Sequence, residues 1–201
     1  SIRSFFNLNK TKIFSKINFH TMKFKIENEL NFKNGKKIGR SEFVFNKLKR
    51  IGLYEIEKDY FKFDIFDKLD QPNKTYKGRF NFKPFYASLE GELDEINLNH
   101  VFGSNAIIIQ FLKTEIFNNK NIDFKVNINS DKIYNNIAFR NINLQVKIQE
   151  GLIDTDNTKF DWRNFADFEL IESLIFVRNG ELVLDGKLKV NIKDYKKVYK
   201  F

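Results

Sequence analysis

Few side chains in this sequence have the type and spacing that catalysis requires. His20 and His100 are the only histidines, and the chain has no cysteine. A nucleophile–histidine pair or a histidine-rich metal site would need these histidines to meet chosen partners. His20 falls in a predicted strand, and neither histidine has such partners in its neighbouring sequence. We therefore predict structural or exposed histidines.

The stretch DTDNTKFD places Asp154, Asp156 and Asp161 close together, which suggests calcium binding. An EF-hand loop that begins at Asp154 requires Gly at its sixth position and Glu at its twelfth. Lys159 and Phe165 occupy these positions. The EF-hand interpretation fails, a looser cation site is a weak alternative, and we predict no metal site.

Glu90 and Glu92 could in principle act as an acid/base pair. They flank Gly91 on one face of a predicted strand, as ordinary solvent-facing residues do. The sequence also has no G-x-S-x-G motif, phosphate-binding glycine loop or dinucleotide fingerprint. We predict a protein that is not an enzyme, with no catalytic residues and no cofactor.

The composition indicates a folded protein without a membrane-spanning helix. Of the 201 residues, 42% are hydrophobic and 30% are charged. No window approaches the roughly 20 apolar residues that a transmembrane helix needs. The length suits one large domain or two small ones, and we expect a single β domain over residues 1–201. Because the chain begins at Ser1 and shows no signal peptide, we expect a fragment of a longer protein.

Apolar and polar residues alternate over most of the chain, which predicts strands. In FKFDIFDK, Phe61, Phe63 and Ile65 alternate with Lys62 and Asp64. Strands that alternate this cleanly are half-exposed members of antiparallel sheets, since buried parallel strands are apolar on both faces. The sequence therefore predicts a mainly β, antiparallel fold.

Turn residues divide the alternating segments. Asn34-Gly35 and Asn179-Gly180 are typical of two-residue hairpins, and we expect a loop at Pro72 and Asn73. Gly186 interrupts NGELVLDGKLKVNI, but the parity of the apolar residues continues across it. We predict one long strand there, with Gly186 at a bulge or at a close approach of two backbones.

One segment departs from the alternation. In SNAIIIQFLKTEIF the apolar residues follow helical spacing, and Ser104 is placed to cap the start. This predicts one short amphipathic helix near 104–117. Such a helix would pack over a core, close the end of a sheet or contact a membrane.

The positive charge is concentrated in residues 1–50, a basic, strand-rich segment. The whole chain has a formal net charge of +9, and this segment holds 13 Lys or Arg residues against three acidic ones. It could bind nucleic acid phosphates or anionic lipid headgroups. Alternatively, it is a solvated strand face with lysine enriched by A/T-rich codons.

The spacing of aromatic and basic residues argues against nucleic acid. Met22, Phe24 and Ile26 share one parity, whereas Lys23 and Lys25 share the other. Bases stacked on the aromatic residues would face away from the charges. We expect no nucleic acid partner and favour an anionic membrane surface for residues 1–50.

The C-terminal half has a recognisable order of elements. A short amphipathic helix is followed by an NKN strand entry in FNNKNIDFKVNINSDKI, a strand ending in QEG in FRNINLQVKIQEG, and a closing NGELVLDGKLKV. Over residues 85–201 this series resembles the C-terminal region of AsmA-like proteins, which are related to the TamB-type envelope proteins of bacteria. The resemblance lies in the general sequence pattern and in the order of the elements, and it includes no catalytic signature.

The resemblance implies a fold, a location and a function. AsmA-like proteins are inner-membrane-anchored, with most of the chain in the periplasm. They form long, bent β-sheets with an apolar concave face and are thought to carry phospholipid acyl chains between the inner and outer membranes. The implied fold is a strongly curved antiparallel sheet that forms a β-groove or trough. The implied partners are phospholipid acyl chains.

Alternating strands have two explanations. In a trough, acyl chains cover the apolar face, and each buried methylene contributes about 0.8 kcal/mol. In a structural or protein-interaction domain, the same faces close into a dry core, and a nucleic-acid-binding β domain is the weaker third possibility. The candidate lipid-contact residues are the apolar positions of the C-terminal strands: Ile122, Phe124, Val126, Ile128, Ile142, Leu144, Val146, Ile148, Leu184, Leu188 and Val190.

Overall fold

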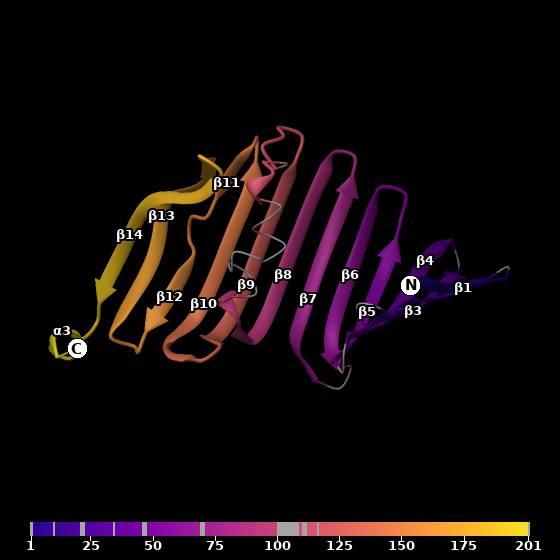
Figure 1. The fold of residues 1–201 in the computed structure, drawn as a ribbon, viewed down its shortest axis with the longest axis horizontal. Helices are drawn as coiled ribbons and strands as arrows, with labels where there is room; N and C mark the ends of the chain where they lie inside the picture. The colour runs from indigo at the N-terminus through magenta and orange to yellow at the C-terminus, as the bar shows by residue number, and fades with distance from the viewer. Residues whose placement is uncertain are drawn as a thin grey trace. The chain divides into compact units, whose positions relative to one another are not determined.

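The computed structural model describes residues 2–9, 11–20, 23–33, 35–45, 48–68, 71–99, 109, 112–115 and 117–200. Strands dominate the described residues (Figure 1), so the mainly β fold class is confirmed. The chain divides into two compact units, which we call unit 1 (Ser1–Pro84) and unit 2 (Phe85–Phe201). Strong curvature and a single domain over residues 1–201 stay predictions.

Unit 1 is an antiparallel meander in which each strand pairs with the next along the chain. Its strands are β1 (Ile2–Leu8), β2 (Lys12–Phe19), β3 (Phe24–Lys33), β4 (Lys36–Phe45), β5 (Leu48–Ile56), β6 (Tyr60–Lys68) and β7 (Gln71–Phe82). Gly35 lies in the predicted hairpin at φ +77°, a conformation that favours glycine. Its neighbour Asn34 lies outside the described residues.

Two local predictions in unit 1 are wrong. Pro72 and Asn73 do not form a loop but belong to β7, and Lys68 of β6 pairs with Gln71 of β7. Proline is tolerated there because it lies near the start of a strand, where a missing N–H disturbs the ladder least. His20 lies in the turn that follows β2 rather than in a strand.

Unit 2 is a mixed sheet that is followed by the short helix α3 (Tyr195–Tyr199). Its strands are β8 (Phe85–Ile96), β9 (Asp123–Ile133), β10 (Asn136–Gln149), β11 (Leu152–Asp154), β12 (Lys159–Trp162), β13 (Ala166–Arg178) and β14 (Glu181–Ile192). Most neighbouring strands are antiparallel, as predicted, but β8 and β9 are parallel, which the alternation did not indicate. Parallel neighbours need a long crossover, and residues 97–122 supply it.

The strands β11 and β12 act as two halves of one interrupted strand. Both pair with β10 on one side and with β13 on the other. The residues between them, 155–158, leave the ladder and approach β13, where Thr155 N–H donates to the Ser173 carbonyl at 3.1 Å. The interruption thus contacts β13 at Ser173, where the pairing of β13 with β14 shifts in register.

The predicted helix near 104–117 falls largely outside the described residues. Ile109, Leu112 and Lys113 are helical in the described part. The helix α3 (Tyr195–Tyr199) was not anticipated from the sequence, and the Asp194 side chain caps it. Within the described ranges, no helix combines the length and the hydropathy that crossing a membrane requires.

Gly186 lies within one long strand, as predicted. Because the register of β13 with β14 shifts between Ile171 and Leu174, two residues, Glu172 and Ser173, face Gly186 alone. This arrangement is a β-bulge in β13. A Cβ atom at position 186 would lie 2.6 Å from Ser173 Cβ and 2.8 Å from its Cα. Only glycine allows the two backbones to approach this closely.

The close approach predicts the effect of Gly186→Ala. We expect the free energy of unfolding to fall by about 1–3 kcal/mol, as overpacking usually costs, when measured by denaturant titration. The neighbouring exposed substitution Asp185→Ala is the control and should change it by less than about 0.5 kcal/mol. A stability increase in Gly186→Ala, which an unstrained Gly→Ala change would give, would contradict the bulge geometry.

Candidate functional site

The predicted lipid-contact residues gather on one face of unit 2. Side chains that pair directly across neighbouring strands project to the same face of a sheet. Phe124 of β9 pairs with Ile148 of β10, which pairs with Ile153 of β11. The row continues from Ile153 to Ile175 of β13 and then to Leu184 of β14. An apolar row therefore crosses five strands.

Parallel rows extend this apolar face along the strands. Val126 pairs with Val146 and Ile128 with Leu144, and Ile142 shares the parity of Leu144 on β10. At the other edge, β14 presents Leu188 and Val190, which pair with Leu170 and Phe168 of β13. Of the predicted residues, only Ile122 lies outside a strand; it directly precedes β9 and is half-buried.

A cleft of about 350 Å³ opens on this apolar face. Its lining includes Ile142, Leu144, Val146, Leu184 and Phe160. Clefts of this size hold small ligands, and polar groups in their walls usually fix the ligand's orientation. The walls of this cleft are aliphatic and aromatic, so they suit a hydrocarbon chain.

The two threonines in the wall do not change this character. Thr155 Oγ1 donates a hydrogen bond to Ser173 Oγ at 2.9 Å, and Thr158 Oγ1 donates to the Gln145 carbonyl at 3.1 Å. Each hydroxyl proton is thus already used within the protein. The cleft therefore offers little hydrogen bonding to a ligand.

Burial changes across the apolar face from its centre to its edge. Ile148 is 2% exposed and Ile142 is 7% exposed, whereas Leu184 and Leu188 are 53% and 51% exposed. Val190 at the same edge is 46% exposed. The face is thus packed at β9 and β10 and open to solvent at β14.

Described parts of the crossover between β8 and β9 contact the sheet of unit 2. Leu98 lines the cleft, and Lys113 Nζ lies 3.1 Å from the Glu181 carboxylate at the start of β14. The Asn118 backbone comes so close to Gly151 that a Cβ there would lie 3.0 Å from its carbonyl oxygen. These contacts anchor the crossover beside the apolar face.

The opposite face of unit 2 is polar and forms cross-strand pairs. Asn143 Nδ2 donates to Asn127 at 2.9 Å, and Asn129 Nδ2 donates to Glu92 at 2.8 Å. Lys159 lies 2.9 Å from Glu169 and, with Lys189, holds the pKa of that carboxyl below its usual value. The unit is therefore a one-sided sheet, apolar on one face and solvated on the other.

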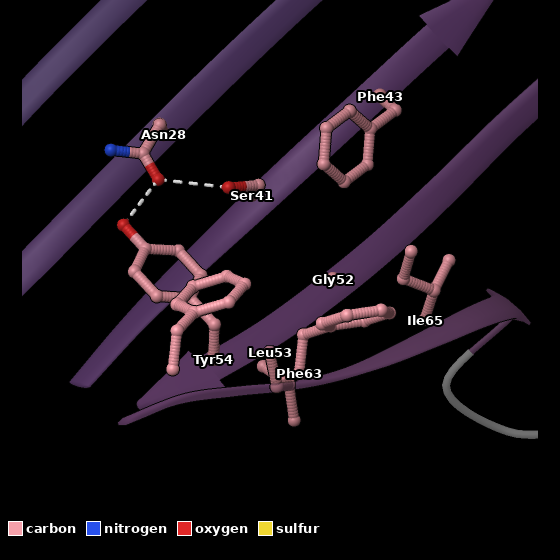
Figure 2. Close-up of a pocket in the computed structure, with 9 residues that line it drawn as sticks. Asn28, Ser41, Phe43, Gly52, Leu53, Tyr54, Phe63 and Ile65 are labelled. Carbon is pink, nitrogen blue, oxygen red and sulfur yellow. Dashed lines mark hydrogen bonds between the residues drawn. The ribbon is translucent and has the colours of Figure 1, made fainter. Parts of the chain in front are cut away.

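Unit 1 contains a second apolar cleft, of about 400 Å³. Phe43, Phe63 and Ile65 line it, and Figure 2 shows a small polar cluster at its side. Within this cluster, Asn28 Oδ1 accepts hydrogen bonds from Ser41 Oγ at 2.8 Å and from Tyr54 Oη at 2.6 Å.

Glycine makes room for the Tyr54 ring in unit 1. Gly39 pairs with Tyr54 across β4 and β5. A Cβ at position 39 would lie 2.0 Å from Tyr54 Cζ, so the ring lies flat over the glycine. Partial burial raises the pKa of the Tyr54 hydroxyl above its usual value, and the protonated hydroxyl donates to Asn28.

Aromatic residues continue the apolar face of unit 1 across β5, β6 and β7. The rings of Tyr54 and Phe61 lie 5.8 Å apart, and those of Phe63 and Phe80 lie 6.0 Å apart. The sequence analysis recognised the alternation of Phe61 and Phe63 but assigned no apolar site to unit 1. The shared parity of the aromatic residues was the signal that could have located this face.

The basic residues of unit 1 are partly engaged in ion pairs. Lys16 and Lys25 lie 2.9 and 2.8 Å from Glu27, and Lys49 lies 2.8 Å from Glu42. Lysine is in excess over acids in residues 1–50, so cationic side chains are left for an anionic surface. That partner stays a prediction.

The residues first considered for chemistry have structural roles or face solvent. Asp156 Oδ1 accepts hydrogen bonds from the Ser173 backbone at 2.6 Å and from Ser173 Oγ at 2.9 Å, which secures the bulge in β13. Asp154 accepts from the Asp156 backbone, and Asp161 accepts from Asn141. Over the described parts of the chain, no three potential metal ligands come together.

Neither acid/base candidate forms a site with the other described residues. Glu90 and Glu92 are exposed on the polar side of β8. His20 is exposed in its turn, and His100 lies outside the described residues. The absence of an enzymatic activity stays a prediction.

Comparisons with known proteins leave the family open. No family model, no curated protein and no solved structure matches the chain.

The ion pairs of unit 1 predict an unusual titration of Glu27. Hydrogen bonds from Lys25 and Lys16 lower the pKa of its carboxyl to about 2. Stability from these pairs should be present above the ordinary glutamate pKa of 4.5 and be lost as the pH falls through about 2. NMR titration of the carboxyl carbon measures this pKa directly.

A matched variant provides the control for this titration. Lys25→Met should raise the pKa of Glu27 towards its ordinary value, whereas Lys12→Met, which removes the pair of Lys12 with Glu29, should leave it unchanged. An ordinary pKa for Glu27 in the unmodified protein would contradict the ion pairing.

Proposed function

We propose that the apolar face of unit 2 binds phospholipid acyl chains. In this proposal the chain is a segment of a non-enzymatic, AsmA-like envelope protein that channels lipid between the inner and outer membranes. The segment would lie in the periplasm, as part of a protein anchored in the inner membrane. The observation that carries the proposal is the apolar cleft beside Leu184, Leu188 and Val190, which remain about half exposed.

Leu184, Leu188 and Val190 expose apolar surface to water on one face of β14, which is unfavourable in free energy unless a partner covers it. Soluble monomers rarely expose large contiguous apolar patches, and such patches mark interaction sites. An acyl chain that lies over these leucines moves its methylenes out of water, at about 0.8 kcal/mol for each. Binding of this kind needs no polar recognition, which agrees with the cleft wall described above.

The gradient of burial suggests how a chain would be held. Ile142, Leu144 and Val146 form a packed floor, while the side chains of β14 remain accessible. An acyl chain would enter at the accessible edge and lie in the cleft against the floor. The apolar face of unit 1 would offer a second surface of the same kind, with Asn28 and Tyr54 as its polar group.

A closed-core structural domain is the second candidate function. The burial of Val126, Ile142 and Ile148, at 8%, 7% and 2% exposure, favours it for the centre of unit 2. Such a core would serve protein interaction or scaffolding without lipid. The two candidates differ in what covers β14.

Lipid binding is tested with a fluorescent fatty acid titrated into the purified chain. We expect saturable binding, and we expect Leu184→Asn and Leu188→Asn each to weaken it about tenfold, since each removes an apolar contact of roughly 1.5 kcal/mol. Both leucines are half exposed, so these variants should remain folded.

The control is Lys189→Asn, which places the same residue on the polar face of the same strand. It should bind the fatty acid as tightly as the unmodified chain. Equal weakening by all three variants, or no saturable binding by the folded protein, would reject the lipid proposal and favour the closed core.

A further inference from the structure

The outer edge of β14 is an unpaired strand edge in the described structure. In Figure 1, β14 lies at the edge of unit 2, and among the described residues it pairs with β13 alone. It runs for 12 residues without proline. Long edge strands with free backbone groups and exposed apolar side chains are templates for pairing with another strand.

The sequence of β14 is complementary to itself when it is reversed about Gly186. In an antiparallel pair centred on Gly186, Asp185 faces Lys187 of a second copy, and Lys187 faces Asp185 of that copy. On the other side of the sheet, Leu184 faces Leu188 and Leu182 faces Val190. Val183 faces Lys189, and this is the one unmatched pair. Directly opposed residues of opposite charge and apolar pairs both stabilise antiparallel strands.

Other registers lose this complementarity. Moving the centre by two residues to Leu188 places Lys187 against Lys189, a like-charge pair. Moving it the other way, to Leu184, places Glu181 against Lys187, but it also places Asp185 against Val183 and shortens the paired segment to residues 181–187 of β14. Register is set by such side-chain patterns, so the strand specifies the pairing about Gly186.

Three of these four groups are available in the structure, and the fourth, Lys187, would have to exchange or share its present partner. Asp185 makes no ion pair with the described residues, and Leu184 and Leu188 are 53% and 51% exposed. Lys187 contacts Glu172 of β13, and that carboxylate is itself exposed to solvent.

We propose that the chain forms a two-fold symmetric dimer in which β14 pairs antiparallel with β14 of a second copy, centred on Gly186. The interface is isologous, so it closes after two copies. The two apolar faces would become one continuous face across the dimer axis. This pairing is independent of whether that face binds lipid.

Charge reversal tests the register by sedimentation velocity in the absence of lipid. The unmodified chain should show a concentration-dependent monomer–dimer equilibrium. Asp185→Lys and Lys187→Asp should each weaken the dimer at least about tenfold, because each creates two like-charge pairs per dimer. An equimolar mixture of these two variants should dimerise again, since their charges are complementary. The double variant Asp185→Lys/Lys187→Asp should also dimerise.

Disulfide trapping gives a second measurement if a charge variant does not fold. The chain has no cysteine, so Leu184→Cys mixed with Leu188→Cys should crosslink under mild oxidation. Leu184→Cys alone should crosslink far less, because its two copies lie out of register.

A monomer at all concentrations would overturn the proposal. Equal dimerisation of all charge variants would overturn the register. Polymers that grow with concentration would show head-to-tail pairing with another edge, such as β1, and would also contradict a closed dimer. Fatty acid binding by a strictly monomeric chain would reject the dimer while leaving the proposed function intact.

Discussion

Cross-strand register is the constraint on which the apolar face of unit 2 depends. Phe168 and Leu170 have even numbers, whereas Ile175 has an odd number, yet all three pair with apolar residues of β14 on one face. The bulge at Glu172 and Ser173 makes this possible because one extra residue reverses the parity of the strand. Without it, the apolar residues on either side would project to opposite faces.

Several groups that are distant in sequence hold this bulge in place. Asp156 binds the backbone and the hydroxyl of Ser173, and Thr155 donates to the same hydroxyl. Gly186 leaves the space that the bulge occupies. The interruption between β11 and β12 therefore lies next to the bulge in β13. Asp156, one of the three aspartates first considered for calcium binding, stabilises this bulge.

The sequence was sufficient to predict the strands but not all of their pairings. Alternation identified the strands that carry Phe63, Val126 and Leu144, and continued parity identified β14 as one strand through Gly186. The parallel pairing of β8 with β9 was missed because alternation reports that a strand is half-exposed and says nothing of its direction.

The site was predicted in part, for a related reason. The residues of β9, β10 and β14 were correctly placed on one face, since side-chain parity is local. Their unequal burial, from 2% at Ile148 to 53% at Leu184, depends on packing between segments far apart in the chain. The polar cluster of Asn28, Ser41 and Tyr54 was missed because its two hydrogen bonds join β3 to β4 and to β5, and no local pattern encodes them.

Both units follow the same principle, a sheet with one apolar and one charged face. In each unit, hydrogen-bonded strands align the apolar side chains in rows, and an apolar cleft opens among these side chains. The side chains that line the two clefts are mostly aliphatic and aromatic. This character is what supports the proposal of acyl-chain binding.

Native mass spectrometry of the chain, purified without detergent from a bacterial envelope fraction, tests the central claim most directly. The account predicts extra mass that matches phospholipid, is released on collisional activation and is lost in a folded Leu144→Asp variant. A clean lipid-free mass from the stably folded, unmodified protein would contradict it and identify the apolar faces as ordinary packing surfaces.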